Sequence, residues 1–243
     1  MTLGLLMLHA FPLDSTMWSA QSEGLADTLP VVTVDLPGFG GAPMVDPEGW
    51  MDEAADLADA ALGGTGIDRV VVCGLSMGGY VALAYARRHR AKLAGLILAN
   101  TRADGDDEAA QERRKGLAER LRAEGNFLAD APPPLLSDGA PAELRERVST
   151  IIRRQEPESI ARASLAMAGR ADSRGDLAGI DVPTLVITSS ADALISPDLS
   201  RQIAEAIPNA ELKTIDGVGH LSNLEAPDAF NGLVRDFVSR TEQ

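Results

Sequence analysis

The chain has 243 residues, 45% hydrophobic and 24% charged, which is ordinary for a globular α/β enzyme with one large core. Its formal net charge of −14 argues against nucleic-acid and anionic-membrane partners, because phosphate binding needs clustered Lys and Arg. No apolar run approaches the about 18 residues that a membrane span needs, so we expect a soluble protein.

The N-terminal segment and the cysteine count predict a cytoplasmic protein. Residues 1–8 have no basic flank and no small-residue cleavage site, so they do not resemble a signal peptide. The single cysteine, Cys73, cannot form an internal disulfide. The histidines His9, His89 and His220 lack metal-binding spacing, so we expect no metal and no cofactor.

The first predicted strand, Leu5–Leu8, runs into the turn His9–Leu13. A strand that ends in a tight turn can aim a backbone N–H at the edge of a sheet, and Phe11 is the best placed donor. We expect His9 to be structural and to bind nearby backbone, because a better general base occurs later in the chain.

The next elements are a buried strand at Val31–Val34 and a helix over Met51–Leu62. Between them, Asp35–Gly41 is rich in glycine. It does not have the G-x-G-x-x-G spacing at a helix start, so it predicts a turn and no dinucleotide site.

The central stretch combines an apolar strand, Val70–Cys73, with a helix over residues 80–86. The turn between them carries the pattern G-x-S-x-G at Gly74–Gly78. Such a sharp turn leaves no room for side chains at its first and last positions, and it lifts the Ser76 hydroxyl above the sheet. The Met77 N–H points into the same space, where a nucleophile and an oxyanion donor belong.

The alternation of strands and helices continues with a strand at Leu93–Ala99. This order predicts a parallel sheet with right-handed crossovers, and active sites in such sheets lie beyond the carboxyl ends of the strands. The composition then changes over residues 101–178, which are rich in Arg, Glu and Ala with apolar residues at helical spacing. We expect a helical cap inserted into a core formed by residues 1–100 and 179–243.

The sheet pattern resumes with a strand at Val182–Thr188, followed by Asp192. Ser196 and Pro197 then predict an N-cap and the first position of a helix. A last strand at Glu211–Ile215 leads to His220, and a closing amphipathic helix follows.

Ser76, Asp192 and His220 each follow a different strand, in the chain order that α/β hydrolases use. With the segments 9–14 and 219–227, the chain resembles that superfamily, and in particular the group around 3-oxoadipate enol-lactonases and small serine esterases. The match covers nearly the whole core. Many relatives have Gly at the position of Ala10, and they begin with antiparallel strands that this chain lacks, so we expect about six strands with the first at or near an edge.

The implied mechanism is ester or lactone hydrolysis by a Ser-His-Asp triad. Ser76 is the nucleophile, His220 the general base and then acid, and Asp192 the residue that orients it. Phe11 and Met77 supply the oxyanion N–H groups. Asp104 also follows a strand, but we favour Asp192 as the orienting carboxylate because one helix and one strand separate it from His220.

The expected substrate is a small molecule in a mostly apolar pocket. Its candidate lining residues are Phe11, Met77, Leu165 and Met167. C–C bond hydrolysis and cofactor-free perhydrolysis could use the same triad, and a ligand-sensing protein on a hydrolase scaffold also stays open. The sequence determines neither the substrate nor the oligomeric state.

Overall fold

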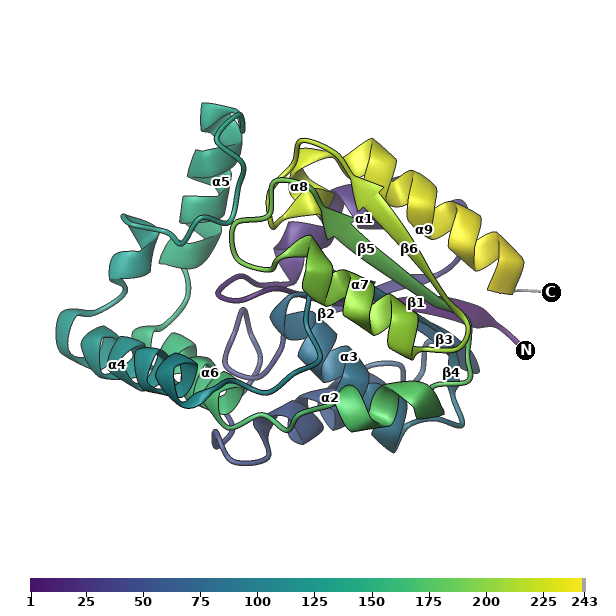
Figure 1. Ribbon diagram of the computed structural model, residues 1–243, viewed down its shortest axis with the longest axis horizontal. Helices are drawn as coiled ribbons and strands as arrows, with labels where there is room; N and C mark the ends of the chain where they lie inside the picture. The colour runs from purple at the N-terminus through teal and green to yellow at the C-terminus, as the bar shows by residue number, and fades with distance from the viewer. Residues whose placement is uncertain (242–243) are drawn as a thin grey trace.

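The computed structural model describes residues 1–241, which contain one sheet of six strands, every neighbouring pair parallel (Figure 1). The strands are β1 (Leu3–Leu8), β2 (Val31–Val34), β3 (Arg69–Leu75), β4 (Leu93–Ala99), β5 (Thr184–Ser189) and β6 (Ala210–Ile215). Their spatial order is β2-β1-β3-β4-β5-β6. The expected parallel sheet is confirmed, and the first strand lies one place in from the edge.

The chain reverses its direction of travel across the sheet between β1 and β3. From β1 it goes outward to β2 at the edge, then returns to the other side of β1 to form β3. Leu8, at the end of β1, is in register with Gly74 near the end of β3. The loops after these strands therefore leave the sheet side by side, at the crevice where doubly wound sheets bind ligands.

Burial along the strands follows their position in the sheet. Every residue of β4 is buried, and so is every residue of β3 after Arg69. Both faces of these central strands are covered by helices, which explains their continuous apolar runs. The edge strands are less covered: β2 is only partly buried, and β6 exposes Lys213 and Thr214.

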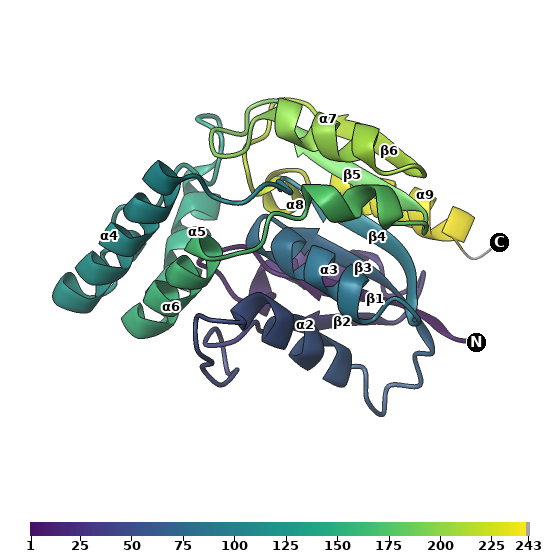
Figure 2. The ribbon, with the colours of Figure 1, turned by 60° about the horizontal axis from the view of Figure 1, so that its bottom comes forward.

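Helices cover both faces of the sheet (Figures 1 and 2). The core helices are α1 (Ser19–Gly24), α2 (Trp50–Ala60), α3 (Met77–Arg88), α7 (Pro197–Ala206), α8 (Ser222–Glu225) and α9 (Pro227–Thr241), with a 3₁₀ turn η1 (Ser15–Trp18). On one face α1 packs against α9, and on the other α2 packs against α3. The start of α7 is as expected, because the Ser196 side chain caps it and Pro197 is its first residue.

Residues 101–178, called the helical insertion below, connect β4 to β5. They contain α4 (Glu108–Glu124), η2 (Phe127–Ala129), α5 (Ala142–Arg153), α6 (Pro157–Ala168) and most of η3 (Arg174–Gly179). Figures 1 and 2 show α4, α5 and α6 standing together at one end of the molecule. In contrast, η3 packs against α7, so the last part of the insertion lies along the core.

Among residues 1–241, no helix is both long enough and apolar enough to cross a membrane.

Candidate active site

Ser76 occupies the tight turn between β3 and α3. Its φ of 55° and ψ of −115° are unfavourable for a residue with a side chain, so the surrounding structure must impose them. A Cβ at Gly74 would lie 2.1 Å from the Gly78 carbonyl oxygen, and one at Gly78 would lie 2.1 Å from the Leu8 carbonyl oxygen. Both glycines of the pattern are therefore required by close backbone approach. Helix α3 begins at Met77, earlier than the sequence indicated.

His220 and Asp192 are paired in the interior. His220 Nδ1 lies 2.8 Å from Asp192 Oδ2, and the two side chains are 2% and 0% exposed. The other carboxylate oxygen, Oδ1, accepts hydrogen bonds from the backbone N–H groups of Leu194 (2.8 Å) and Ile195 (3.0 Å). Both oxygens of the carboxylate are thus fixed, and the imidazole is held by one of them.

These contacts determine the charge of Asp192. Burial alone would raise the pKa of this carboxyl group, but the hydrogen bond and charge of His220, with further bonds from Ile195 and Asn100, outweigh that effect and lower the pKa. Asp192 is therefore ionised at neutral pH. An ionised Asp192 next to Nδ1 favours the tautomer in which Nδ1 carries the proton and Nε2 is free to accept one.

Asn100, the residue directly after β4, also contacts the Asp192 carboxylate. Asn100 Nδ2 donates to Asp192 Oδ2 (3.0 Å) and to Ser189 Oγ (2.9 Å), while Asn100 Oδ1 accepts from Ser222 Oγ (2.7 Å). Asn100 has a φ of 45°, a conformation that asparagine tolerates better than most residues. Sequence reasoning missed this residue, although its place directly after a buried strand was a usable signal.

Ser76, Asp192 and His220 follow β3, β5 and β6 in turn. Because the strands are parallel, all three residues lie beyond the same, carboxyl-terminal, ends of the strands. Within residues 1–241, no hydrogen bond joins the Ser76 hydroxyl to His220. Catalytic hydrogen bonds are often long in the absence of substrate and shorten when it binds. Transfer of the Ser76 proton to His220 stays a prediction.

Two backbone N–H groups near Ser76 are available for an incoming ligand. In the described part of the chain, neither Phe11 nor Met77 donates its N–H to a protein acceptor. The Phe11 turn is held by His9, whose Nδ1 lies 3.1 Å from the Ala10 carbonyl oxygen and whose Nε2 accepts from the Leu36 N–H at 2.9 Å. His9 is thus structural, as expected, and burial lowers its pKa and keeps it neutral.

The expected pocket residues come from different parts of the fold. Met77 and Met167 are buried, while Phe11 and Leu165 are partly buried against the core. Met167 packs between α4 and α6, where its sulfur lies 3.4 Å from Arg114 Nη1. Their contact with a substrate stays a prediction.

Asp104, the other carboxylate considered for orienting His220, is paired with an arginine instead. It forms an ion pair with Arg102, whose Nε lies 2.6 Å from Asp104 Oδ1. The structure therefore places Asp192, and not Asp104, on the catalytic histidine candidate.

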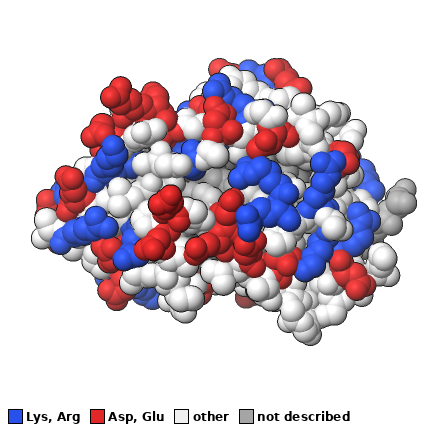
Figure 3. Space-filling view, turned by 90° about the horizontal axis from the view of Figure 1, so that it is seen from below, with Lys and Arg blue, Asp and Glu red and all other residues white. Residues whose placement is uncertain are grey.

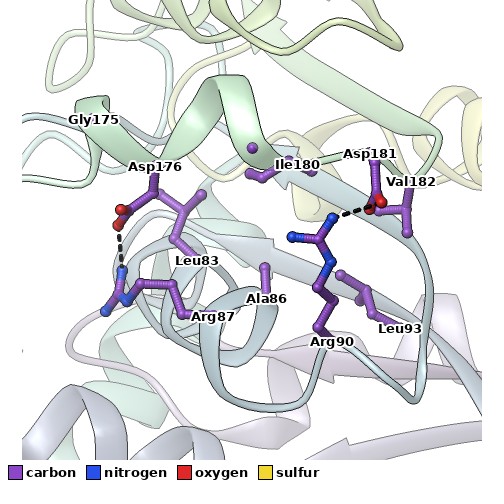
Figure 4. A pocket seen from close by; sticks show the side chains of 11 residues that line it. Leu83, Ala86, Arg87, Arg90, Leu93, Gly175, Asp176, Ile180, Asp181 and Val182 are labelled. Atoms are coloured by element: carbon purple, nitrogen blue, oxygen red, sulfur yellow. Dashed lines mark hydrogen bonds and ion pairs between the residues drawn. The ribbon is translucent and has the colours of Figure 1, made fainter.

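A cavity of about 320 Å³ lies between α3 and η3, and ion pairs of Arg87 with Asp176 (3.4 Å) and Arg90 with Asp181 (2.6 Å) span its rim (Figure 4). It is lined by Leu93, the first residue of β4, whereas the residues of the candidate site follow the other ends of the strands. This cavity is thus separate from the candidate site.

The surface charge is unevenly distributed. Figure 3 shows Lys and Arg side chains gathered on one side of the face seen from below, with acidic side chains next to them. Many basic groups in this protein are paired, for example Arg88 with Asp56 and Lys92 with Asp59.

In the described residues, no group of three or more His, Cys, Asp or Glu side chains could hold a metal ion.

A parallel sheet with a strained serine at one strand end and a histidine–aspartate pair at two others defines an α/β hydrolase. The model of the α/β hydrolase family matches residues 5–233, and the chain belongs to this family.

Named relatives include esterases and a lactonase. The chain is 31% identical to a pimeloyl-(acyl-carrier protein) methyl ester esterase of Neisseria meningitidis, over 96% of this chain and 92% of that protein. It is 29% identical to 3-oxoadipate enol-lactonase 1 of Acinetobacter baylyi, over 93% of this chain and 84% of that protein. A solved thermophilic esterase from Thermogutta terrifontis is 38% identical, with a TM-score of 0.91 over 99% of this chain and 91% of that one. The resemblance inferred from the sequence is confirmed.

Proposed function

We propose that the protein is a serine hydrolase that cleaves small carboxylic esters or lactones through an acyl-enzyme on Ser76. The observation that carries this proposal is the buried pair of His220 and Asp192, in which Nδ1 and Oδ2 are 2.8 Å apart. The pair lies beyond the carboxyl ends of the strands, as does the strained Ser76 after β3. A neutral imidazole held by an ionised carboxylate is the arrangement that makes a serine hydroxyl nucleophilic.

The first half of the reaction acylates the enzyme. His220 Nε2 takes the Ser76 hydroxyl proton while the oxygen attacks the carbonyl carbon of the substrate. The carbonyl π-electrons move to its oxygen, and the N–H groups of Phe11 and Met77 donate to the resulting oxyanion. The tetrahedral intermediate then collapses: the carbonyl re-forms, the bond to the alcohol oxygen breaks, and His220 gives that oxygen the proton.

The second half releases the acid. His220 takes a proton from water, whose oxygen attacks the acyl carbon and forms a second oxyanion at the same two N–H groups. Its collapse breaks the bond to Ser76, and the serine oxygen takes the proton back. Asp192 stays ionised throughout and stabilises the imidazolium that forms in each half.

The substrate class is supported by the relatives and by the apolar side chains near the site. Two of the named relatives are esterases and one is a lactonase, and each name describes hydrolysis at an acyl carbon. We propose that the helical insertion acts as a cap and that Phe11, Met77, Leu165 and Met167 line an apolar acyl pocket beneath it. Each methylene accommodated there contributes only about 1 kcal/mol, so selectivity among short acyl chains should be gradual.

The test is a hydrolysis screen over short-chain esters and lactones, run on the wild type and on Ser76→Ala. Loss of the nucleophile should lower kcat by about 10⁴-fold or more, and a fluorophosphonate should label Ser76 in the wild type. Ser239→Ala, a change at an exposed serine of α9, is the matched control and should keep full activity. If Ser76→Ala kept more than a tenth of the wild-type turnover, the acyl-enzyme assignment would be wrong.

A further inference from the structure

A segment of the helical insertion lies directly against the loop that carries His220. The Leu221 N–H donates to the Leu135 carbonyl oxygen at 3.0 Å. On the other side of His220, the Gly219 N–H donates to Glu225 Oε1 at 2.8 Å, and the same oxygen accepts from the Ser137 N–H at 3.0 Å. The backbone on both sides of the histidine is thus bonded to the inserted segment or to a carboxylate shared with it.

The contact between this segment and the His220 loop leaves no space for a side chain at position 219. A Cβ at Gly219 would lie 2.4 Å from the Ser137 nitrogen and 2.7 Å from the Leu136 carbonyl carbon, so only glycine allows the approach. The second oxygen of Glu225 accepts from the Ser137 hydroxyl. Within residues 1–241, the hydrogen bonds to this carboxylate come only from Ser137 and Gly219.

The inserted segment is in turn fixed to helix α5. Arg145, on that helix, donates from Nη2 to the carbonyl oxygens of Ser137 (2.6 Å) and Asp138 (3.0 Å). Hydrogen bonds thus run from α5 through Ser137 and Glu225 to Gly219.

We propose that Glu225 is a positioning residue that couples the helical insertion to the catalytic histidine, so that His220 is held in its reactive position only while residues 135–137 are docked. The inference rests on the proposed ester hydrolysis for its kinetic consequences. Its physical basis is that small displacements of a catalytic group lower the rate strongly, and a bond to an ionised carboxylate is stronger than one between neutral groups. The insertion then assists the chemical step in addition to shaping the pocket.

The kinetic test uses single and double variants at the shared carboxylate. Glu225→Ala should lower kcat by about 10-fold or more with KM changed less than about threefold, because the defect lies in the position of the base. Glu225→Gln, which keeps one acceptor oxygen, should recover most of the activity. Ser137→Ala should lower kcat by about threefold, and it should add nothing in the Glu225→Ala background, since the two groups act through one contact.

The matched control is Glu143→Ala, an exposed glutamate at the start of α5. It should leave kcat and KM unchanged. A normal kcat for Glu225→Ala, or fully additive losses in the double variant, would overturn the proposal.

A readout that does not depend on activity separates this inference from the proposed function. In hydrogen exchange measured by mass spectrometry, Glu225→Ala should raise exchange together in peptides covering 133–140 and 217–223, with no rise in Glu143→Ala. Coupled exchange with no ester turnover by the wild type would support the contact and reject the proposed function. Turnover by the wild type, with exchange rising in only one of the two segments, would reject the coupling and leave the proposed function standing.

Discussion

Asn100 donates a hydrogen bond to Asp192 Oδ2, the same carboxylate oxygen that faces Nδ1 of His220. Asp192 Oδ2 is therefore a hydrogen-bond acceptor shared by the Asn100 amide and the catalytic histidine candidate. The amide itself is fixed, because its own oxygen accepts from the Ser222 hydroxyl. A donor in this position lowers the pKa of Asp192 and limits how strongly the carboxylate can attract the imidazole proton.

Asn100→Ala should shift the pH dependence of the enzyme. Without the amide, the charge of Asp192 acts more fully on His220, which favours the imidazolium. The acidic limb of kcat/KM should therefore move to higher pH, and kcat should fall by about 10-fold. The measurement is a pH profile of ester hydrolysis from pH 5 to 9 alongside a thermal unfolding curve.

The comparison variant is Ser222→Ala, which removes the bond to Asn100 Oδ1 and leaves both bonds from Nδ2. It should give a smaller shift in the same direction. Alanine at a φ of 45° also costs about 1 kcal/mol of stability, so the profiles are compared only over the pH range in which the thermal unfolding curve shows the variant to be folded. Superimposable profiles for Asn100→Ala and the wild type would contradict this role.

Asp192→Asn should lower kcat by about 10³-fold or more, because an amide cannot stabilise the imidazolium and can hold the wrong tautomer of His220. Asp104→Asn should leave kcat within about threefold of the wild type, since Asp104 is paired with Arg102. Both variants are nearly isosteric, so steady-state kinetics at one pH are enough. The opposite ranking of the two variants would exclude Asp192 as the orienting residue.

The local chemistry of the strand ends was visible in the sequence. The turn at Ser76 requires Gly74 and Gly78 at fixed positions, and the central strands β3 and β4 supply nearly continuous apolar runs, so both features can be recognised from neighbouring residues. The order of Ser76, Asp192 and His220 then follows from the alternation of strands and helices. These predictions depend on short-range patterns and on one topological rule.

The contacts that hold the site together were not predictable in the same way. Glu225 meets Ser137 across 88 positions of the chain, and Arg170 meets Asp106 across 64, with nothing in the local pattern to mark either pair. Arginine and glutamate are common on solvated helices, so the sequence gives no sign of which pairs become buried. Their partners depend on how the inserted helices dock, which long-range packing decides.

His9 should make stability depend on pH in a range where carboxylates do not titrate. Burial lowers its pKa below the ordinary value of 6.5, so between those two values the unfolded chain binds a proton that the folded chain does not. The free energy of unfolding should therefore fall as the pH drops below about 6.5, with a slope of at most about 1.4 kcal/mol per pH unit. Urea unfolding at pH 7.5, 6.5 and 5.5 measures this slope.

His9→Asn removes the titrating group and should give a less stable protein with a flatter dependence over the same pH range. The loss of stability comes from the bonds to Ala10 and Leu36, whereas the loss of slope comes from the proton. An unchanged slope in this variant would show that another group is responsible.

The charge of the protein should affect its choice of substrate. The arginines that could attract an anion from the insertion are each close to an acid: Arg153 to Glu146, Arg154 to Asp14, and Arg170 to Asp106. These paired arginines therefore do not form a local positive site. The net charge of −14 should then lower the local concentration of anionic substrates.

At low ionic strength, kcat/KM should therefore be several-fold higher for a neutral short-chain ester than for a carboxylate-bearing ester of the same length. Added salt should narrow the difference, since the Debye length falls from about 30 Å at 0.01 M to about 8 Å at 0.15 M and screens the repulsion. The value for the neutral ester should stay nearly constant and serves as the control for general salt effects. A preference for the carboxylate-bearing ester that weakens with salt would instead reveal a local positive site, and it would favour an activity closer to that of the enol-lactonase relative.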